Sequence, residues 1–220
     1  MSKKTPKKTS TLKALSKSER IMNGVNLWAG YYRCNPHRFC RDYLNIMLDT
    51  FQKILITMMF KSNYFIYLAA RGAGKTWLTA VFCVAWCILY PNTKIVVASG
   101  VKNQAMLVME KIRDELVPNS PNLNREISEI RLGLDNAYIK FKNGSMIRAV
   151  PATDNARGGR ANILILDEYR LVDEGIYKGV LRRFLAGGRE CGYHRKTKYK
   201  KRRERNKELF LSSAWFESHW

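Results

Sequence analysis

Tyr67-Leu-Ala-Ala-Arg-Gly-Ala-Gly-Lys-Thr76 is the stretch that decides the fold of this 220-residue chain. The apolar residues before the glycines predict a buried strand over 64–70, and Lys75-Thr-Trp-Leu begins a helix. A turn of small residues between a strand and a helix directs backbone N–H groups and the positive end of the helix dipole at one point, which suits a polyphosphate. The sequence therefore predicts a phosphate-binding loop, although Ala69 stands where the usual pattern has its first glycine.

The positions of this loop have distinct expected roles. Lys75 would reach the terminal phosphates, and the hydroxyl group of Thr76 would help to hold Mg²⁺. Gly72 and Gly74 leave room for a phosphate to approach the backbone. The residues expected to bind the nucleotide phosphates are Arg71, Gly72, Ala73, Gly74, Lys75 and Thr76.

A second apolar run, Asn162-Ile-Leu-Ile-Leu, ends in two acids, Asp167 and Glu168. The run is too short and too rich in β-branched residues for a helix, so it predicts a buried strand. Asp167 would hold Mg²⁺ through its water shell, and Glu168 would polarise the attacking water as a general base. The alternative, that both acids only cap the following helix, is weaker because the phosphate loop precedes them. Together the motifs predict an ATPase in which Lys75 and the acid pair face one cleft on neighbouring strands.

The basic residues of the chain are concentrated in two runs. The formal net charge is +21; residues 1–20 hold seven basic residues and one acid, and residues 195–207 hold nine and one, which leaves +7 for the rest. Such runs favour a polyanion, above all nucleic acid, because binding releases counterions. The alternative is a solvated tail and loop that only aid solubility.

The cysteines and the hydropathy exclude several classes of protein. Five cysteines, an odd number, argue against a disulfide framework and suit a reducing cytosol. Cys34-x-x-His37-x-x-Cys40 has zinc-like spacing, but no second pair of ligands follows, and ordinary cysteines are the favoured interpretation. No signal peptide is visible, and the longest apolar stretch, residues 78–90, is shorter than the roughly 20 residues of a membrane span. We therefore expect a soluble, intracellular protein.

The chain reads as a disordered basic tail over 1–20 followed by a single domain over 21–220. Helices are expected over 36–60, 75–90, 102–116 and 176–185, and strands over 64–70, 94–99, 162–167 and 208–213. A hairpin with an Asn143-Gly144 turn is expected over 136–150, and a loop with two prolines over 118–124. Strands that alternate with helices predict a mostly parallel α/β sheet with covered faces.

Several stretches carry a resemblance to one family. They are Arg71 directly before Gly-x-Gly-Lys-Thr, Leu48-Asp-Thr-Phe-Gln52, the stretch from Ile95 to Ala105, Ala156-Arg157-Gly-Gly-Arg160 before the acid strand, and Leu211-Ser-Ser-Ala214. In type and order they are similar to the large terminase subunit of tailed bacteriophages, the motor that packages DNA into capsids. The resemblance runs from about residue 38 to residue 214 and implies a P-loop NTPase fold of the RecA/ASCE type, a three-layer sandwich.

The resemblance also implies roles for further residues. Gln52 would bind the adenine edge, for which an amide offers both donor and acceptor, although it also reads as an exposed polar residue of a helix. Arg71 would act on developing phosphate charge; its alternative is a salt bridge to an acid such as Glu168 in the empty state. Rival arginine fingers, which would otherwise contact DNA or a neighbouring subunit, are Arg157 and Arg160. The residues of the coupling motif that would sense the γ-phosphate, or be plain strand-end serines, are Ser212 and Ser213.

The partners implied by this resemblance are ATP with Mg²⁺, double-stranded DNA, a small terminase subunit and a portal, with the motor as a homo-oligomeric ring in the host cytoplasm and no membrane. The acids near the end of the chain, Glu204, Glu208 and Glu217, are scattered, so a nuclease is expected on a separate domain or chain. Two other interpretations remain: a helicase-like DNA-dependent ATPase, and a non-catalytic basic DNA-binding fragment.

Overall fold

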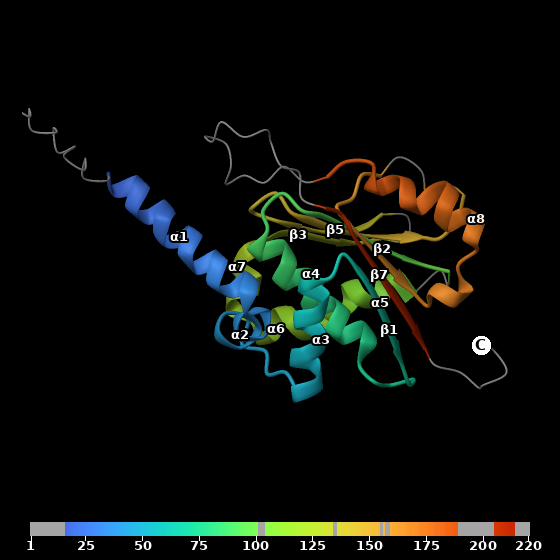
Figure 1. The fold of residues 1–220 in the computed structure, drawn as a ribbon, viewed down its shortest axis with the longest axis horizontal. Helices are drawn as coiled ribbons and strands as arrows, with labels where there is room; N and C mark the ends of the chain where they lie inside the picture. The colour runs from blue at the N-terminus through green and yellow to red at the C-terminus, as the bar shows by residue number, and fades with distance from the viewer. Residues whose placement is uncertain are drawn as a thin grey trace, which may run out of the picture.

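The computed structural model describes residues 16–100, 104–133, 136–154, 156, 159–188 and 205–213. These residues form a seven-stranded sheet in the order β1-β7-β6-β2-β5-β4-β3, with helices on both faces (Figure 1). The strands are β1 Tyr64–Ala69, β2 Lys94–Ser99, β3 Ile127–Leu132, β4 Ala137–Phe141, β5 Met146–Pro151, β6 Ile163–Asp167 and β7 Lys207–Ser213. The neighbouring strands β1, β7, β6, β2 and β5 pair in parallel in that order, and β4 is antiparallel to both of its neighbours, β5 and β3. The predicted mostly parallel α/β sheet is confirmed.

The strand order corrects one expectation about the two motifs. The phosphate-loop strand β1 and the acid strand β6 are not neighbours, because β7 pairs in parallel with both of them. Leu68 and Ala69 of β1 stand opposite Ser212 and Ser213. The end of β7 therefore lies between the phosphate loop and the acid pair.

Helix α4, Lys75–Leu89, follows the phosphate loop and forms the centre of the main core. Every residue from Leu78 to Leu89 is buried, as expected for a helix that is apolar on all sides. Rings of Phe82 and Trp86 pack against Phe60 of α3 with centroids 5.5 and 4.8 Å away. The helix ends before Pro91, as the sequence predicts.

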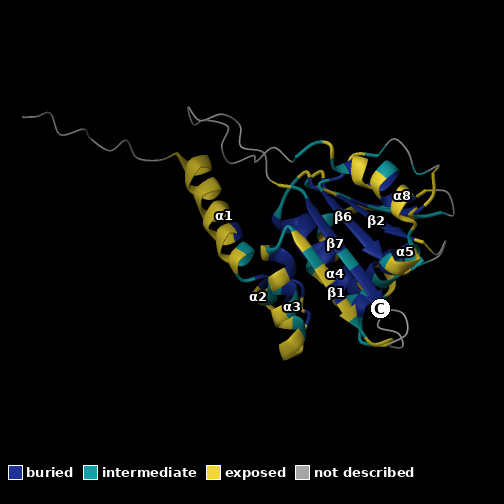
Figure 2. Ribbon diagram, turned by 45° about the vertical axis from the view of Figure 1, so that its right-hand side comes forward, coloured by how far each residue is buried: buried dark blue, intermediate teal, exposed yellow. Residues whose placement is uncertain are grey.

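The N-terminal region differs from the sequence prediction. The single helix expected over 36–60 is two helices, α2 Pro36–Asp42 and α3 Thr50–Lys61, and the chain between them bends at Asn45, whose φ is +56°. Helix α1, Lys17–Cys34, was not predicted; it begins with a capping box of Ser16 and Glu19, so the last residues of the expected tail are helical. Most of α1 is exposed and extends away from the sheet (Figure 2). Residues 1–15 lie outside the described residues.

Between β2 and β4 the chain is more helical than expected. Helix α5, Gln104–Glu110, continues as the π-helix η1, Lys111–Leu116, within the predicted helix, whose residues 102 and 103 are not described. The prediction of a loop over 118–124 is wrong, because this segment lies in two short helices, α6 Val117–Asn119 and α7 Pro121–Glu126. Pro121 begins α7, where a missing N–H breaks no helical hydrogen bond. Pro118 lies in α6, which continues η1 without a break in the helical backbone conformation. The predicted hairpin of β4 and β5 is confirmed, with Gly144 at φ +83° in its turn.

A smaller core covers the other face of the sheet. After the 3₁₀ turn η2, Tyr169–Leu171, three helical segments follow: α8 Glu174–Ile176, η3 Tyr177–Leu181 and η4 Arg182–Leu185. They pack on β6 and β2 through Leu181 and Phe184, which confirms a helix over 176–185 and a three-layer arrangement. Strand β1 lies beyond this cover at the edge of the sheet, so Tyr64, Ile66 and Leu68 are exposed, contrary to the expected buried strand. Among the described residues, no helix has the length and apolar character to cross a membrane.

Candidate nucleotide-binding site

The phosphate loop lies between β1 and α4, and its conformation requires glycine. Gly72 and Gly74 have φ of +83° and +72°, in the left-handed region that side chains rarely adopt. Gly74 is the N-cap of α4, so the helix N-terminus points out of the loop. No atom lies within 4 Å of a Cβ built on either glycine, which leaves open space above the backbone. The loop therefore has the room and the helix N-terminus that a phosphate requires.

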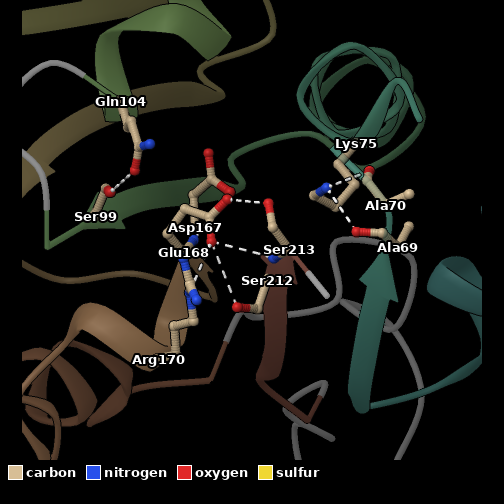
Figure 3. A network of polar contacts seen from close by, with 10 residues as sticks. All are labelled: Ala69, Ala70, Lys75, Ser99, Gln104, Asp167, Glu168, Arg170, Ser212 and Ser213. Atoms are coloured by element: carbon tan, nitrogen blue, oxygen red, sulfur yellow. Dashed lines mark hydrogen bonds and ion pairs between the residues drawn. The ribbon is translucent and has the colours of Figure 1, made fainter. Parts of the chain in front are cut away.

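Lys75 is buried beneath this loop. Its Nζ donates hydrogen bonds to the carbonyl oxygens of Ala69 at 3.1 Å and Ala70 at 3.0 Å (Figure 3). Only 8% of Lys75 is exposed, so its ammonium group is held in place by the backbone of the loop itself. A phosphate that enters the loop would offer this ammonium group a charged acceptor in place of the carbonyls.

One cavity of about 820 Å³ brings the two motifs together. The predicted residues that line it are Arg71, Gly72, Gly74, Lys75, Thr76, Asp167, Glu168 and Ser213. Lining residues that were not predicted to bind the nucleotide include Gln104, Lys111, Arg170 and Leu171. Lys75 and the acid pair thus face a common cavity, with the serines at the end of β7 between them (Figure 3).

Asp167 ends β6 at the floor of this cavity and is 4% exposed. Burial raises the pKa of its carboxyl group to about 6, even though the N–H of Glu168 donates to Oδ1 at 3.0 Å. A raised pKa shows that the negative charge is poorly compensated by the protein alone. A divalent cation held between Asp167 and the hydroxyl group of Thr76 would supply that compensation, so these residues fit Mg²⁺.

Glu168 has the opposite electrostatic environment. Its carboxylate accepts hydrogen bonds from the backbone N–H of Ser213 at 3.1 Å, from Ser213 Oγ, and from Ser212 Oγ at 3.4 Å. Arg170 Nε lies 3.6 Å from the same carboxylate. Burial would raise the pKa of Glu168, but the hydrogen bonds from Ser213 and the charge of Arg170 hold it below its ordinary value. The two adjacent acids therefore differ: the pKa of Asp167 is raised and that of Glu168 is lowered, so Glu168 remains a carboxylate, as a general base must, to a lower pH than Asp167 does.

The backbone of Glu168 is also unusual. Its φ of +46° and ψ of 51° lie in the left-handed region, which is uncommon for a residue with a side chain. This conformation turns the chain sharply after β6, so that Asp167 points into the cavity while Glu168 reaches towards β7 (Figure 3). Left-handed residues outside glycine cluster at functional sites, where the surrounding contacts hold them.

The structure places the remaining predicted residues less directly. Arg71 lines the cavity, whereas the arginine ion-paired to Glu168 is Arg170. Gln52 does not line the cavity; its side-chain oxygen accepts from the N–H of Asp49 and caps α3. The start of α3 nevertheless lies at the same end of the molecule as the phosphate loop (Figures 1 and 2).

Three further predicted features lie at or beyond the margin of this site. Arg160 is exposed, Ala73 donates its N–H to Ala70 O at 3.2 Å, and Arg157 lies outside the described residues. Cys40 of the zinc-like stretch is buried, which raises the pKa of its thiol to about 12. Within the described ranges, no three residues of the metal-ligating types gather in one place.

Sequence reasoning missed Arg170 and Gln104, for which weak signals exist. Arg170 follows the acid pair by two residues, close enough for its side chain to return to Glu168. Gln104 belongs to the stretch from Ile95 to Ala105, and its side-chain oxygen accepts a hydrogen bond from Ser99 Oγ at 3.1 Å, beside Asp167. Neither position could be placed in the cavity without the strand order. A phosphate loop, an acid pair across one cavity and this strand order define a P-loop NTPase fold of the ASCE class.

The chain belongs to the family of large terminase subunits. Residues 66–198 match the family model described as "Terminase large subunit, T4likevirus-type, N-terminal". The fold is similar to that of the large terminase of bacteriophage HK97, with a TM-score of 0.60 and 20% identity over 84% of this chain and 37% of that one. It is also similar to the large terminase ATPase domain of Thermus phage P74-26, with a TM-score of 0.54 and 16% identity over 78% of this chain and 67% of that one. No curated protein sequence matches the chain.

Proposed function

We propose that this chain is the ATP-hydrolysing motor domain of a phage terminase large subunit, which drives double-stranded viral DNA into the procapsid. The observation that carries the proposal is the cavity that Lys75, Asp167 and Glu168 line together. Family membership supports the same function. The chain spans 37% of the HK97 large terminase, so the packaging activity of the whole protein is part of the proposal.

ATP would bind with its phosphates in the loop between β1 and α4. The N–H groups of Gly72 and Gly74 and the N-terminus of α4 would bind the β- and γ-phosphates, whereas the N–H of Ala73 donates to Ala70 O. Lys75 would exchange the carbonyl oxygens of Ala69 and Ala70 for phosphate oxygens, and Thr76 and Asp167 would hold Mg²⁺. When bound, Mg²⁺ neutralises charge on the phosphates. Gln52 would reach the adenine only by leaving its cap on α3.

Glu168 would act as the general base on the attacking water. Its carboxylate stays ionised because Ser213 donates two hydrogen bonds to it. Arg71, in the loop, would stabilise charge on the transferring phosphate. Ser212 and Ser213 would couple the state of the site to the rest of the sheet, because they touch the base directly and belong to the strand between the two motifs.

The partners of the motor are proposed on the family likeness and on charge. They are double-stranded DNA, a small terminase subunit, a portal and further copies of the chain in a ring, in the cytoplasm of the bacterial host. DNA cleavage would need a separate domain or chain. Glu208, one of the few acids near the end of the chain, is engaged by Tyr177 and Arg182 at the sheet edge opposite the cavity.

An ATP-hydrolysis assay tests the proposal. Phosphate release should require Mg²⁺, should stop in EDTA, and should fall to background in Lys75→Ala, which removes the ammonium group beneath the loop. Nucleotide affinity should fall in the same variant. A folded wild-type protein that releases no phosphate, with or without duplex DNA, would support the non-catalytic DNA-binding interpretation instead.

A further inference from the structure

Strands β1 and β7 begin at the end of the sheet opposite the nucleotide cavity. We call this end, where the strands start, the edge. Helix α3 ends there at Lys61, and Arg205 lies two residues before the start of β7. A second cavity of about 480 Å³ opens at this edge, lined by Tyr64, Arg182 and Arg205 among others. Figure 1 shows β7 running from this edge to the nucleotide site.

This edge carries more positive than negative charge. Lys61 and Arg205 are exposed, and neither has an ion-pair partner within the described parts of the chain. Lys207 lies just behind the surface, where its Nζ donates to the carbonyl oxygens of Met59, Phe60 and Ser62.

The acid at this edge is already occupied. Glu208 is 4% exposed and accepts a hydrogen bond from the hydroxyl group of Tyr177 at 2.5 Å. Its other oxygen lies 3.6 Å from Nε of Arg182, whose side chain is 53% exposed. Arg182 can therefore contact Glu208 and still present part of its guanidinium group to the solvent.

The flanks of the basic run meet at the same place. Asn206 donates its side-chain amide to Leu185 O at 2.5 Å, and Asn162 donates to Gly187 O at 3.5 Å, so the described residues on either side of 189–204 lie together at this edge. In the sequence, residues 189–204 carry eight basic residues and two acids. The described residues that flank this basic run in the sequence thus lie at the edge that carries Lys61, Arg182 and Arg205.

We propose that this edge, formed by Lys61, Arg182 and Arg205, is a docking surface for the phosphodiester backbone of DNA. Ammonium and guanidinium groups that neutralise phosphates release counterions, which supplies binding that does not depend on base sequence. Choosing DNA as the polyanion rests on the proposed motor function. The surface lies about 20 Å from Glu168 along the seven residues of β7, so DNA and nucleotide can bind together. β7 then joins the docked DNA directly to the serines that hold the general base.

Fluorescence anisotropy with a fluorescein-labelled 30-base-pair duplex tests this surface. The double variant Lys61→Ala/Arg205→Ala removes two charges that have no structural partner in the described ranges. Each lost phosphate contact should weaken binding about tenfold at about 0.1 M salt, and the slope of log Kd against log salt should fall by about two. Arg182→Ala should weaken binding further; it is measured separately, with a thermal melt, because it also unpairs Glu208.

The matched control is Arg125→Ala/Arg131→Ala, which removes two exposed arginines in α7 and β3. β3 is the outer strand of the sheet farthest from β1. Its affinity and salt slope should equal those of the wild type. The proposal is overturned if Lys61→Ala/Arg205→Ala binds the duplex as the wild type does, or if the control loses as much affinity.

ATP hydrolysis without DNA separates this proposal from the motor function. Basal turnover should be unchanged in Lys61→Ala/Arg205→Ala, because neither residue lines the nucleotide cavity. A wild type that binds DNA through this edge but hydrolyses no ATP would leave the docking surface standing and refute the motor. ATP hydrolysis by the wild type, together with a DNA affinity that these substitutions leave unchanged, would support the motor and refute the docking surface.

Discussion

Asp167→Asn should stabilise the nucleotide-free protein at high pH, although it removes a proposed ligand of Mg²⁺. Burial raises the pKa of Asp167 from the ordinary 3.8 to about 6 in the folded protein. An acid whose pKa is higher in the folded than in the unfolded state does not destabilise the fold below about pH 4. The destabilisation grows between about pH 4 and pH 6 and stays constant above about pH 6. The difference of about two pH units corresponds to about 3 kcal/mol, at about 1.36 kcal/mol per unit.

The melting temperature, followed by circular dichroism at pH 4 and pH 8, measures this effect. At pH 8 the variant should melt about 6–12 °C above the wild type, since 1 kcal/mol shifts a chain of this size by about 2–4 °C. At pH 4 the two proteins should melt together. Asparagine keeps an oxygen that can accept the N–H of Glu168, so the local hydrogen bond is retained.

Asp42→Asn is the control for this prediction. Asp42 is exposed, and its hydrogen bond with Arg41 lowers its pKa, so removing its charge should give no gain at pH 8. Equal melting temperatures for Asp167→Asn and wild type at pH 8 would refute the claim that the site stores an uncompensated charge. A loss of stability at pH 8 would refute it more strongly.

Three further variants, with Lys142→Met as a control, test the contacts around β7. Ser213→Ala should move the acid limb of the pH–rate profile up by about one pH unit, because Glu168 loses a hydrogen bond of about 1.5 kcal/mol that favours its charged form. Ser212→Ala, whose bond is longer at 3.4 Å, should move it less, and an equal shift in both would contradict the assignment. Lys207→Met should lower the melting temperature by about 6–12 °C, because about 3 kcal/mol of hydrogen bonding to the end of α3 is lost. Lys142→Met, an exposed position, should change it by less than about 2 °C, and a similar loss there would show that charge alone matters.

Local patterns predicted the elements that carry the chemistry. The strands at 94–99 and 162–167 and the helix from Lys75 are strongly apolar and end at glycine, proline or acids, so their boundaries are visible in the sequence. The pairing of Lys75 with the acids across one cavity followed from the order of the motifs. Expectations that depended on distant contacts were less accurate, because the sequence does not show which strands are neighbours.

Several elements could not be predicted for identifiable physical reasons. β3 lacks strict alternation of polar and apolar residues, because Ser128 and Glu129 are both polar where the strand register shifts, so its signal is weak. The segment over 118–124 reads as a loop because of its prolines, but Pro121 occupies the first turn of α7 and Pro118 lies in α6, which continues η1. Gln52 satisfies a helix N-terminus, a local role that sequence spacing cannot distinguish from adenine binding. Arg170 lies beside Glu168 at a turn where Glu168 has a left-handed backbone conformation, which local sequence patterns do not predict.

Turnover and nucleotide affinity of Glu168→Gln, measured on the same preparation, test the central claim most directly. Glu168 is the proposed general base, whereas the loop around Lys75 is proposed to bind the phosphates. The substitution should therefore lower turnover without changing nucleotide affinity. The dissociation constant for Mg·ATP should stay within about threefold of the wild type, while hydrolysis should fall by about 10²–10⁴. Hydrolysis at the wild-type rate in this variant would contradict the account, because the acid held by Ser213 would then not be the base.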